Sequence, residues 1–188
     1  MRSRTLIAPK GDETRPTLDR TRESLFNIIV AEVPGARVLD LYAGSGALAL
    51  EALSRGAGNA VLCDCSREAA KAIRQNISAL RVEDRARFLP MRDAQAVTRL
   101  GRENARFDLV FLDPPYRMDT ADICRALDAA GVLLPGALVI IEHAAAALPA
   151  PGAAYALTDR RKYRDTMISF YRYGRDDHAE GMGVSGEL

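Results

Sequence analysis

The stretch from Val38 to Ala49 reads VLDLYAGSGALA, an apolar run that passes through a glycine-rich turn into a helical pattern. Gly44, Gly46 and Ala49 have the spacing G-x-G-x-x-A, which lets the backbone approach a ligand that a Cβ atom would exclude. Asp64 follows at the end of the next apolar run, where a carboxylate can accept hydrogen bonds from both hydroxyls of an adenosine ribose. The stretch therefore predicts a strand, a nucleotide-binding turn and a helix, with a tight turn that binds no ligand as the alternative.

Asp40 bears on which cofactor this turn suits. A carboxylate at the end of the first strand would repel a pyrophosphate at the following helix N-terminus, whereas it suits the ammonium of a methionine moiety. This favours S-adenosylmethionine over NAD, although an NAD-dependent oxidoreductase would also use the glycines and Asp64. Asp93 is placed either to reach the adenine amino group or to cap a helix. The predicted cofactor contacts are Asp40, Tyr42, Ala43, Gly44, Ser45, Gly46, Asp64, Cys65, Asp93 and Ala94.

Short apolar runs alternate with helical patterns on both sides of the turn, which is typical of an α/β protein with a doubly wound, mostly parallel sheet and helices on both faces. We expect helices over residues 17–33, from the glycine turn to about 55, and over 66–80, 94–101 and 120–130. We expect about seven strands, over residues 37–42, 60–64, 86–90, 107–113, 137–142, 155–158 and 166–173. A single domain would span residues 1–175, with 1–16 as an N-terminal extension and 176–188 as a disordered acidic tail.

The segment from Asp113 to Tyr116 reads DPPY and follows the strongest predicted strand, FDLVFL. Its residues suit the methylation of a planar, conjugated amine, whose lone pair is delocalised into the ring. The Asp113 carboxylate and the Pro114 carbonyl would each accept one N–H, and the two prolines would fix the backbone. Tyr116 offers a face on which a flipped base can stack, and Pro115 completes the predicted catalytic segment. The alternative is an ordinary proline-containing loop after a strand.

Composition limits the remaining function classes. The 188 residues carry a net charge of +1 and are 48% hydrophobic, which is ordinary for one globular domain. No apolar stretch approaches the roughly 20 residues of a membrane span, and no signal peptide is evident, so we expect a cytoplasmic monomer. Three cysteines and two distant histidines predict no metal site. We interpret Cys63, Cys65 and Cys124 as small buried hydrophobes and His143 as structural.

Positive charge is concentrated near the C-terminus, where six Lys or Arg and one acid lie between residues 160 and 175. Such clusters contact nucleic-acid phosphates and make binding depend on salt. The alternative is ordinary solvated surface charge. The predicted nucleic-acid contacts are Arg15, Arg20 and Arg22 around the first helix, and Arg160, Arg161, Lys162 and Arg164 near the C-terminus.

These motifs resemble those of the class I methyltransferases that modify exocyclic amines. Arg15-Pro16-Thr17, RESLFN from Arg22, LDLYAGSGALALEALSRGA and FDLVFLDPPY together resemble the bacterial RsmD family over about residues 15–173. The resemblance implies a Rossmann-like sheet of seven strands with a reversed last strand, and S-adenosylmethionine as cofactor. It also implies methylation of guanine N2 in 16S ribosomal RNA, either naked or in a 30S particle.

Two features depart from that family. The N-terminus, MRSRTLIAPKG, is shortened where members usually have an additional strand, and Tyr163-Arg164 stands where they commonly have Tyr-Gly. Three other function classes stay open. The first is a methyltransferase acting on DNA, another RNA, a small molecule or a protein amide; the chain shows no added target-recognition domain. The others are an NAD-dependent oxidoreductase, which leaves DPPY unexplained, and a non-enzymatic RNA-binding protein.

Overall fold

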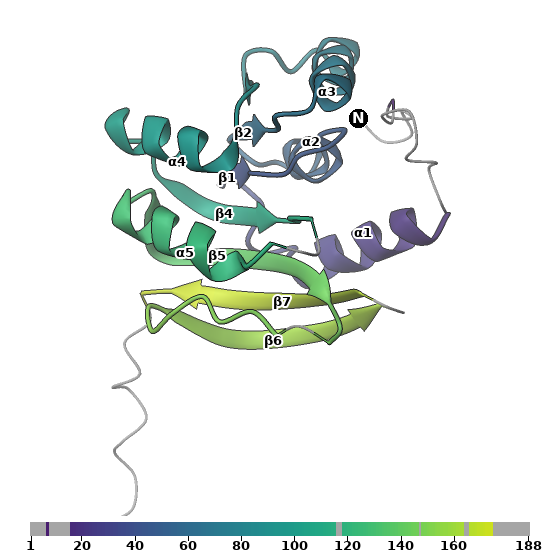
Figure 1. The fold of residues 1–188 in the computed structure, drawn as a ribbon. Helices are drawn as coiled ribbons and strands as arrows, with labels where there is room; N and C mark the ends of the chain where they lie inside the picture. Colours follow the sequence, from purple (N-terminus) through teal and green to yellow (C-terminus); the bar gives the residue numbers. More distant parts are fainter. Residues whose placement is uncertain (1–6, 8–15, 116–117, 147, 164–165, 175–188) are drawn as a thin grey trace, which may run out of the picture.

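Seven strands form one sheet in the order β3-β2-β1-β4-β5-β7-β6 (Figure 1). The computed structural model describes residues 7, 16–115, 118–146, 148–163 and 166–174. The strands are β1 Arg37–Asp40, β2 Asn59–Cys63, β3 Ala86–Leu89, β4 Phe107–Leu112, β5 Leu133–Ala144, β6 Tyr155–Tyr163 and β7 Thr166–Tyr173. The helices are α1 Pro16–Ile28, α2 Ala47–Ser54, α3 Arg67–Leu80, α4 Asp93–Arg102 and α5 Thr120–Ala129. The predicted α/β class is confirmed.

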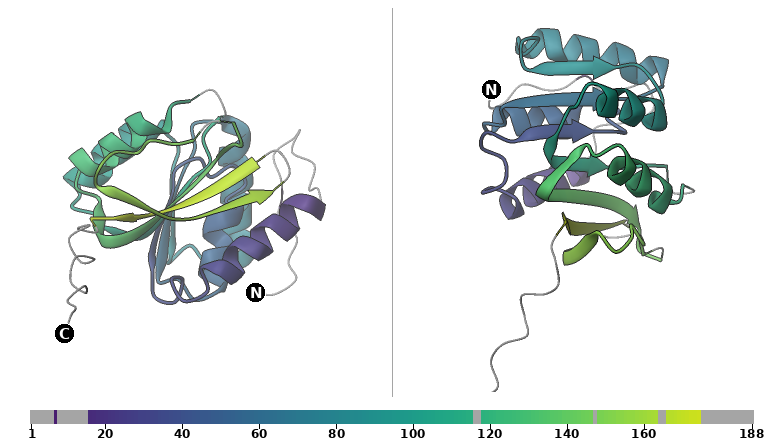
Figure 2. Two further views of the ribbon diagram at one scale, coloured as in Figure 1. Left: turned by 90° about the horizontal axis from the view of Figure 1, so that it is seen from below. Right: turned by 90° about the vertical axis from the view of Figure 1, so that its left-hand side faces the viewer.

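Helices cover both faces of the sheet, as the alternating sequence pattern predicts (Figure 2). The helices α1, α2 and α3 pack on one face through apolar side chains that include Phe26, Leu50 and Ile73. On the other face, α4 and α5 contribute Leu100 and Leu127 to a second core. Burial on both faces explains why the central strands are continuous apolar runs rather than alternating ones.

The strand order reverses between β1 and β4, the point where open α/β sheets usually bind ligands. These two strands are parallel neighbours, with Asp40 opposite Phe111. The glycine turn follows β1 and the Asp-Pro-Pro segment follows β4. Both predicted motifs therefore lie at one edge of the sheet, at its topological switch point.

The last two predicted strands form a hairpin, and β7 is antiparallel to both β5 and β6. The implied reversal of the last strand is therefore confirmed. Because β6 runs in the same direction as β5, its C-terminal half lies at the same sheet edge as the ends of β4 and β5. This half carries Arg160, Arg161 and Lys162.

Several predicted element boundaries are wrong. The first helix ends at Ile28, not Val33. Ile29 and Val33 are buried like the apolar residues of the helix, but they lie in the turns that follow it, so the apolar pattern runs past the helix end. The strand predicted over residues 137–142 begins at Leu133 and ends at Ala144, with irregular pairing to β4 beside Pro135 and Gly136; such residues in a strand often mark a bulge. The strand predicted over 155–158 extends to Tyr163. Residues 159–162 are charged, but the chain stays in the sheet there because β7 pairs with it.

Candidate active site

The glycine turn adopts the left-handed backbone that its sequence predicts. Gly44 has φ +55° and Gly46 has φ +81°. A Cβ atom on Gly46 would lie 2.8 Å from Leu62 Cδ2, whereas one on Gly44 would meet nothing within 4 Å. Gly46 is therefore required for packing beneath α2, while Gly44 opens onto free space in which a ligand can approach the backbone.

Asp64 follows β2 and links its end to the glycine turn. One carboxylate oxygen accepts the Gly44 N–H at 3.0 Å, and the other accepts the Ser66 N–H at 2.8 Å. Ser66, where the helix predicted over residues 66–80 begins, caps α3 by accepting the Ala69 N–H at 3.3 Å. These contacts hold the Asp64 carboxylate beside the turn while its remaining lone pairs can accept hydroxyl groups.

Asp40 ends β1 and is almost completely buried, with 2% of its surface exposed. Its carboxylate accepts the Ala49 N–H at 3.3 Å. Burial raises the pKa of Asp40 to about 7, the Ala49 hydrogen bond opposes this rise, and the charges of Asp113 and Asp64 add to it. A buried acid among other acids favours a cationic or hydrogen-donating ligand and disfavours a pyrophosphate.

The other predicted cofactor residues surround this turn. Tyr42 donates its hydroxyl to Asp93 Oδ2 at 2.5 Å, which connects the end of β1 to α4. Asp93 is the first residue of α4 and Arg92 is its N-cap, so the capping interpretation of Asp93 is wrong. Ala43 is buried and its N–H bonds the Cys63 carbonyl, and Ala94 is exposed.

Cys65 is exposed, whereas Cys63 and Cys124 are buried. The interpretation of all three cysteines as buried is therefore wrong for Cys65, because β2 ends at Cys63 and the chain then leaves the core. Among the described residues, no group of three or more His, Cys, Asp or Glu could hold a metal ion. In the same ranges no helix is long and apolar enough to cross a membrane.

Asn76 was missed by the sequence analysis. This α3 residue is 2% exposed and donates to the Ser45 carbonyl at 2.9 Å. Its amide also makes two hydrogen bonds with the backbone of Ile7, at 2.8 and 2.9 Å. Asn76 therefore positions both the glycine turn and a residue of the predicted N-terminal extension. A buried asparagine beside Ile73 and Ile77 in an otherwise apolar stripe was the available signal.

The Asp-Pro-Pro segment leaves β4 at the same sheet edge. Asp113 and Pro115 are exposed and Pro114 is buried, while the predicted stacking residue Tyr116 lies outside the described residues. A pocket of about 310 Å³ adjoins this segment. It is lined by Pro114, Pro115, Met118, Asp119, Thr120, Glu142, His143, Ala144, Leu148 and Pro149. The volume is at the lower end of the range of small-ligand sites, about 300–1,000 Å³, so the pocket suits one planar ring system.

Two pocket residues come from the end of β5. Glu142 was missed as a site residue, and burial together with the charge of Asp113 raises its pKa to about 7. His143 is buried within β5, where its Nε2 bonds Ser169 Oγ at 2.8 Å and its Nδ1 bonds the Ala144 carbonyl at 2.9 Å. The hydrogen bond to β7 agrees with the structural interpretation of His143.

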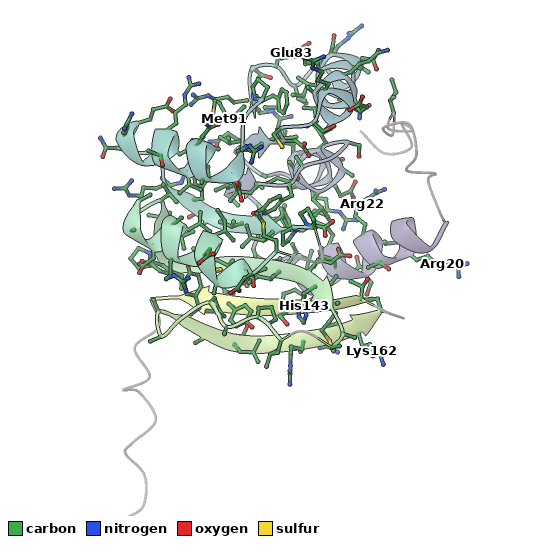
Figure 3. All side chains as sticks on the ribbon, in the orientation of Figure 1. Arg20, Arg22, Glu83, Met91, His143 and Lys162 are labelled. Atoms are coloured by element: carbon green, nitrogen blue, oxygen red, sulfur yellow. The ribbon has the colours of Figure 1, made fainter. Side chains whose placement is uncertain are left out.

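Those predicted RNA contacts that the structure describes lie on α1 and β6, toward the active-site edge (Figure 3). Arg20, Arg160, Arg161 and Lys162 are exposed, and Arg22 is half-buried. Arg161 forms an ion pair with Asp159 at 2.8 Å. The two elements are joined by a hydrogen bond of 2.9 Å between Ser24 Oγ and the Tyr163 hydroxyl. Arg15 and Arg164, also predicted to contact RNA, lie outside the described residues.

The strand order, the acid-lined glycine turn and the Asp-Pro-Pro segment beside a ring-sized pocket define a class I, Rossmann-like methyltransferase. The family model described as "Conserved hypothetical protein 95" matches residues 1–172. The chain belongs to this family, and the predicted resemblance to RsmD-type methyltransferases is confirmed.

Individual relatives agree with this assignment. The chain is 36% identical over 142 residues to "Ribosomal RNA small subunit methyltransferase D" of Escherichia coli K12, covering 75% of this chain and 70% of that protein. A solved Escherichia coli structure, provisionally named methyltransferase yhhF, is 29% identical with a TM-score of 0.82 and covers 93% of this chain and 94% of its own. The solved structure of a conserved hypothetical protein from Streptococcus pyogenes is 37% identical with a TM-score of 0.74, and the match covers 81% of this chain and 94% of that chain.

Proposed function

We propose that the chain transfers a methyl group from S-adenosylmethionine to the exocyclic N2 amine of a guanine in 16S ribosomal RNA. The observation that carries the proposal is the position of the Asp-Pro-Pro segment, between the acid-lined glycine turn and the ring-sized pocket. The relatives named small-subunit ribosomal RNA methyltransferases support the RNA target. We expect the protein to act as a monomer in the cytoplasm, on naked RNA or on a 30S particle.

The groups around the glycine turn fit S-adenosylmethionine. Asp64 can accept the ribose hydroxyls beside the Gly44 backbone, to which it is already bonded. Asp40 is buried and can accept the methionine ammonium, whose positive charge would lower the raised pKa of this carboxyl. Asp93 is held by Tyr42 at the rim and can accept the adenine amino group. When bound, the cofactor supplies an electrophilic methyl group on a sulfonium.

Asp113 and Pro114 orient the acceptor amine. The carboxylate and the backbone carbonyl each accept one N–H, which directs the nitrogen lone pair away from the ring plane and toward the methyl group. Holding the two reactants in this arrangement supplies much of the rate. The Asp113 carboxylate can also take the proton that the amine loses after transfer. Its effect on the pKa of both Asp40 and Glu142 is consistent with a position between the cofactor site and the pocket.

The basic residues of α1 and β6 bind the RNA backbone around the flipped base. Their phosphate contacts would position the RNA without reading its sequence. The Ser24–Tyr163 hydrogen bond keeps α1 and β6 together, so that Arg20 and Lys162 form parts of one surface.

The test is methyl transfer from radiolabelled S-adenosylmethionine to 30S particles, naked 16S RNA, DNA or no acceptor, followed by digestion and identification of the labelled nucleoside. Label in N2-methylguanosine from the ribosomal RNA is the expected result. Label in DNA, or label in a different nucleoside, would contradict the proposed target while leaving the methyltransferase assignment in place.

Variants of Asp113 test the mechanism in the same assay. Asp113→Ala should lower turnover by orders of magnitude, and calorimetry should show that the variant still binds the cofactor. Asp122→Asn is the matched control, because Asp122 is an exposed acid on α5. Turnover of Asp113→Ala close to that of the wild type would refute the assigned role.

A further inference from the structure

Glu142 lies on β5, beside the point where the chain leaves the end of β4 at Asp113. Leu112, the last residue of β4, is opposite Ile141 of β5, and Asp113 and Glu142 are the residues that directly follow this pair. Parallel strands are about 4.8 Å apart, and opposite residues point to the same face. The chain positions bring the two carboxylates together at the active-site edge, where the charge of Asp113 acts on Glu142 and Glu142 lines the pocket beside Pro114.

The register continues across the hairpin to the basic strand. Glu142 is opposite Ile168 of β7, and Ile168 is opposite Arg161 of β6. One row of the sheet thus runs from Glu142 at the pocket through Ile168 to Arg161 on the predicted RNA surface, and Asp113 follows β4 beside its inner end. A base that enters the pocket from RNA bound on β6 would meet Glu142 beside Asp113.

A pair of carboxylates matches guanine among the four RNA bases. The Watson–Crick edge of guanine presents two adjacent donors, N1–H and the N2 amine. Adenine and cytosine present a ring nitrogen acceptor beside their amine, and a carboxylate facing that acceptor would lose a hydrogen bond and gain repulsion. Enzymes that act on flipped bases read this edge by hydrogen bonds.

We propose that Glu142 is a specificity-determining residue that accepts the N1–H of the target guanine while Asp113 and Pro114 hold its N2 amine. This inference rests on the proposed function and deepens it, because it assigns the choice of base to a residue outside the Asp-Pro-Pro segment.

The charges around Glu142 give the proposal a pH signature. The titratable and charged groups around it are Asp113 after β4, Asp119 and His143, which line the same pocket, and Arg161, two strands away in the sheet. Burial and the charge of Asp113 raise the pKa of Glu142 to about 7. Guanine binding requires the ionised carboxylate as acceptor, so activity on RNA should fall as the pH drops through that value.

The first experiment compares wild type, Glu142→Gln, Glu142→Ala and the control Glu83→Gln in the RNA assay at saturating cofactor. Glu83 is an exposed glutamate in the turn between α3 and β3, far from the pocket (Figure 3). Glu142→Ala should lower kcat/KM for RNA by about 10- to 100-fold, the effect of losing one hydrogen bond to a charged group. Glu142→Gln keeps a neutral acceptor and should lose the decline of kcat/KM below pH 7.

The second experiment replaces the target guanosine, once mapped, by 2-aminopurine riboside, which keeps the exocyclic amine but has an acceptor at N1. Wild type should disfavour this RNA by at least about 10-fold. Glu142→Ala should discriminate much less, because no carboxylate faces N1. A merely structural role of Glu142 would lower activity on both RNAs by the same factor.

The outcomes separate the two proposals. If the wild type forms no N2-methylguanosine, the proposed function and the inference both fall. If it does, but Glu142→Ala keeps full discrimination against 2-aminopurine and Glu142→Gln keeps the wild-type pH profile, the inference alone is overturned.

Discussion

The two glycines of the cofactor turn should respond differently to the same substitution. Gly46→Ala places a Cβ atom 2.8 Å from Leu62 Cδ2 and 3.2 Å from Leu50 Cδ1, at a residue with φ +81°. Gly44→Ala places one in open space, at φ +55°. The two variants therefore share the backbone strain and differ in the steric clash.

The magnitudes follow from these contacts. A left-handed backbone costs an alanine about 1–2 kcal/mol. Overpacking adds about 1–3 kcal/mol, because Leu62 and Leu50 are buried and cannot move freely. Gly46→Ala should therefore lower the free energy of unfolding by about 2–5 kcal/mol, and Gly44→Ala by about 1–2 kcal/mol.

Urea unfolding measures this difference, and calorimetric titration with S-adenosylmethionine measures affinity under conditions where both variants are folded. Thermal unfolding should agree, at roughly 2–4 °C per kcal/mol for a chain of this size. Gly44→Ala should bind the cofactor more weakly although it stays folded with only a small loss of stability, because its methyl group occupies the space that the ligand approaches. Equal losses of stability in the two variants would refute the steric argument, and normal affinity in Gly44→Ala would refute the assignment of that space to the cofactor.

Three further changes test the charged groups. Asp64→Ala should weaken S-adenosylmethionine binding by at least about 10-fold, since it removes a charged acceptor; an unchanged dissociation constant by calorimetry would contradict the ribose role. Burial raises the pKa of Asp40 to about 7, so the folded state holds a proton that the unfolded state releases near pH 4, and the free energy of unfolding should fall as the pH rises between these values. Asp40→Asn should remove this slope, so that the variant gains more stability relative to wild type at pH 8 than at pH 5. A stability difference between the two proteins that is the same at both pH values, measured by urea unfolding, would be evidence against it. Neutralising Arg160, Arg161 and Lys162 together should weaken RNA binding and flatten its salt dependence, and an unchanged affinity across a salt titration would remove them from the RNA surface.

The sequence predicts the central sheet well because local and tertiary preferences agree there. The VLDLYAGSGALA stretch combines an apolar run, a turn that requires positive φ and a helical pattern, and the structure has a strand, a left-handed turn and a helix in that order. Ser66 caps α3 at the predicted start of that helix, because an N-cap depends on a few adjacent residues only. The Asp-Pro-Pro segment was likewise recognisable, since two prolines directly after an apolar strand leave few backbone arrangements.

The sequence fails where pairing across the sheet decides the structure. Lys162 lies in a strand because β7 supplies its partner, although its neighbours are charged. Glu142 becomes a pocket residue only because β5 pairs with β4 and continues past the end of that strand. Asn76 owes its role to Ser45 and Ile7, which are 31 and 69 residues away along the chain. None of these relations has a local sequence pattern.

The ligands of the proposed reaction give a reason for the four acids at the switch point to lie close together. Asp40, Asp64, Asp113 and Glu142 approach one edge of the sheet. Burial, and to a lesser extent repulsion by the neighbouring acids, raises the pKa of Asp40 and Glu142. Such an arrangement destabilises the protein without ligands. It suits an enzyme whose two substrates present donors to it, an ammonium and hydroxyls on one side and ring N–H groups on the other. If the proposed function holds, each bound donor would find a carboxylate already in position, which is the condition for an aromatic amine to face the methyl group.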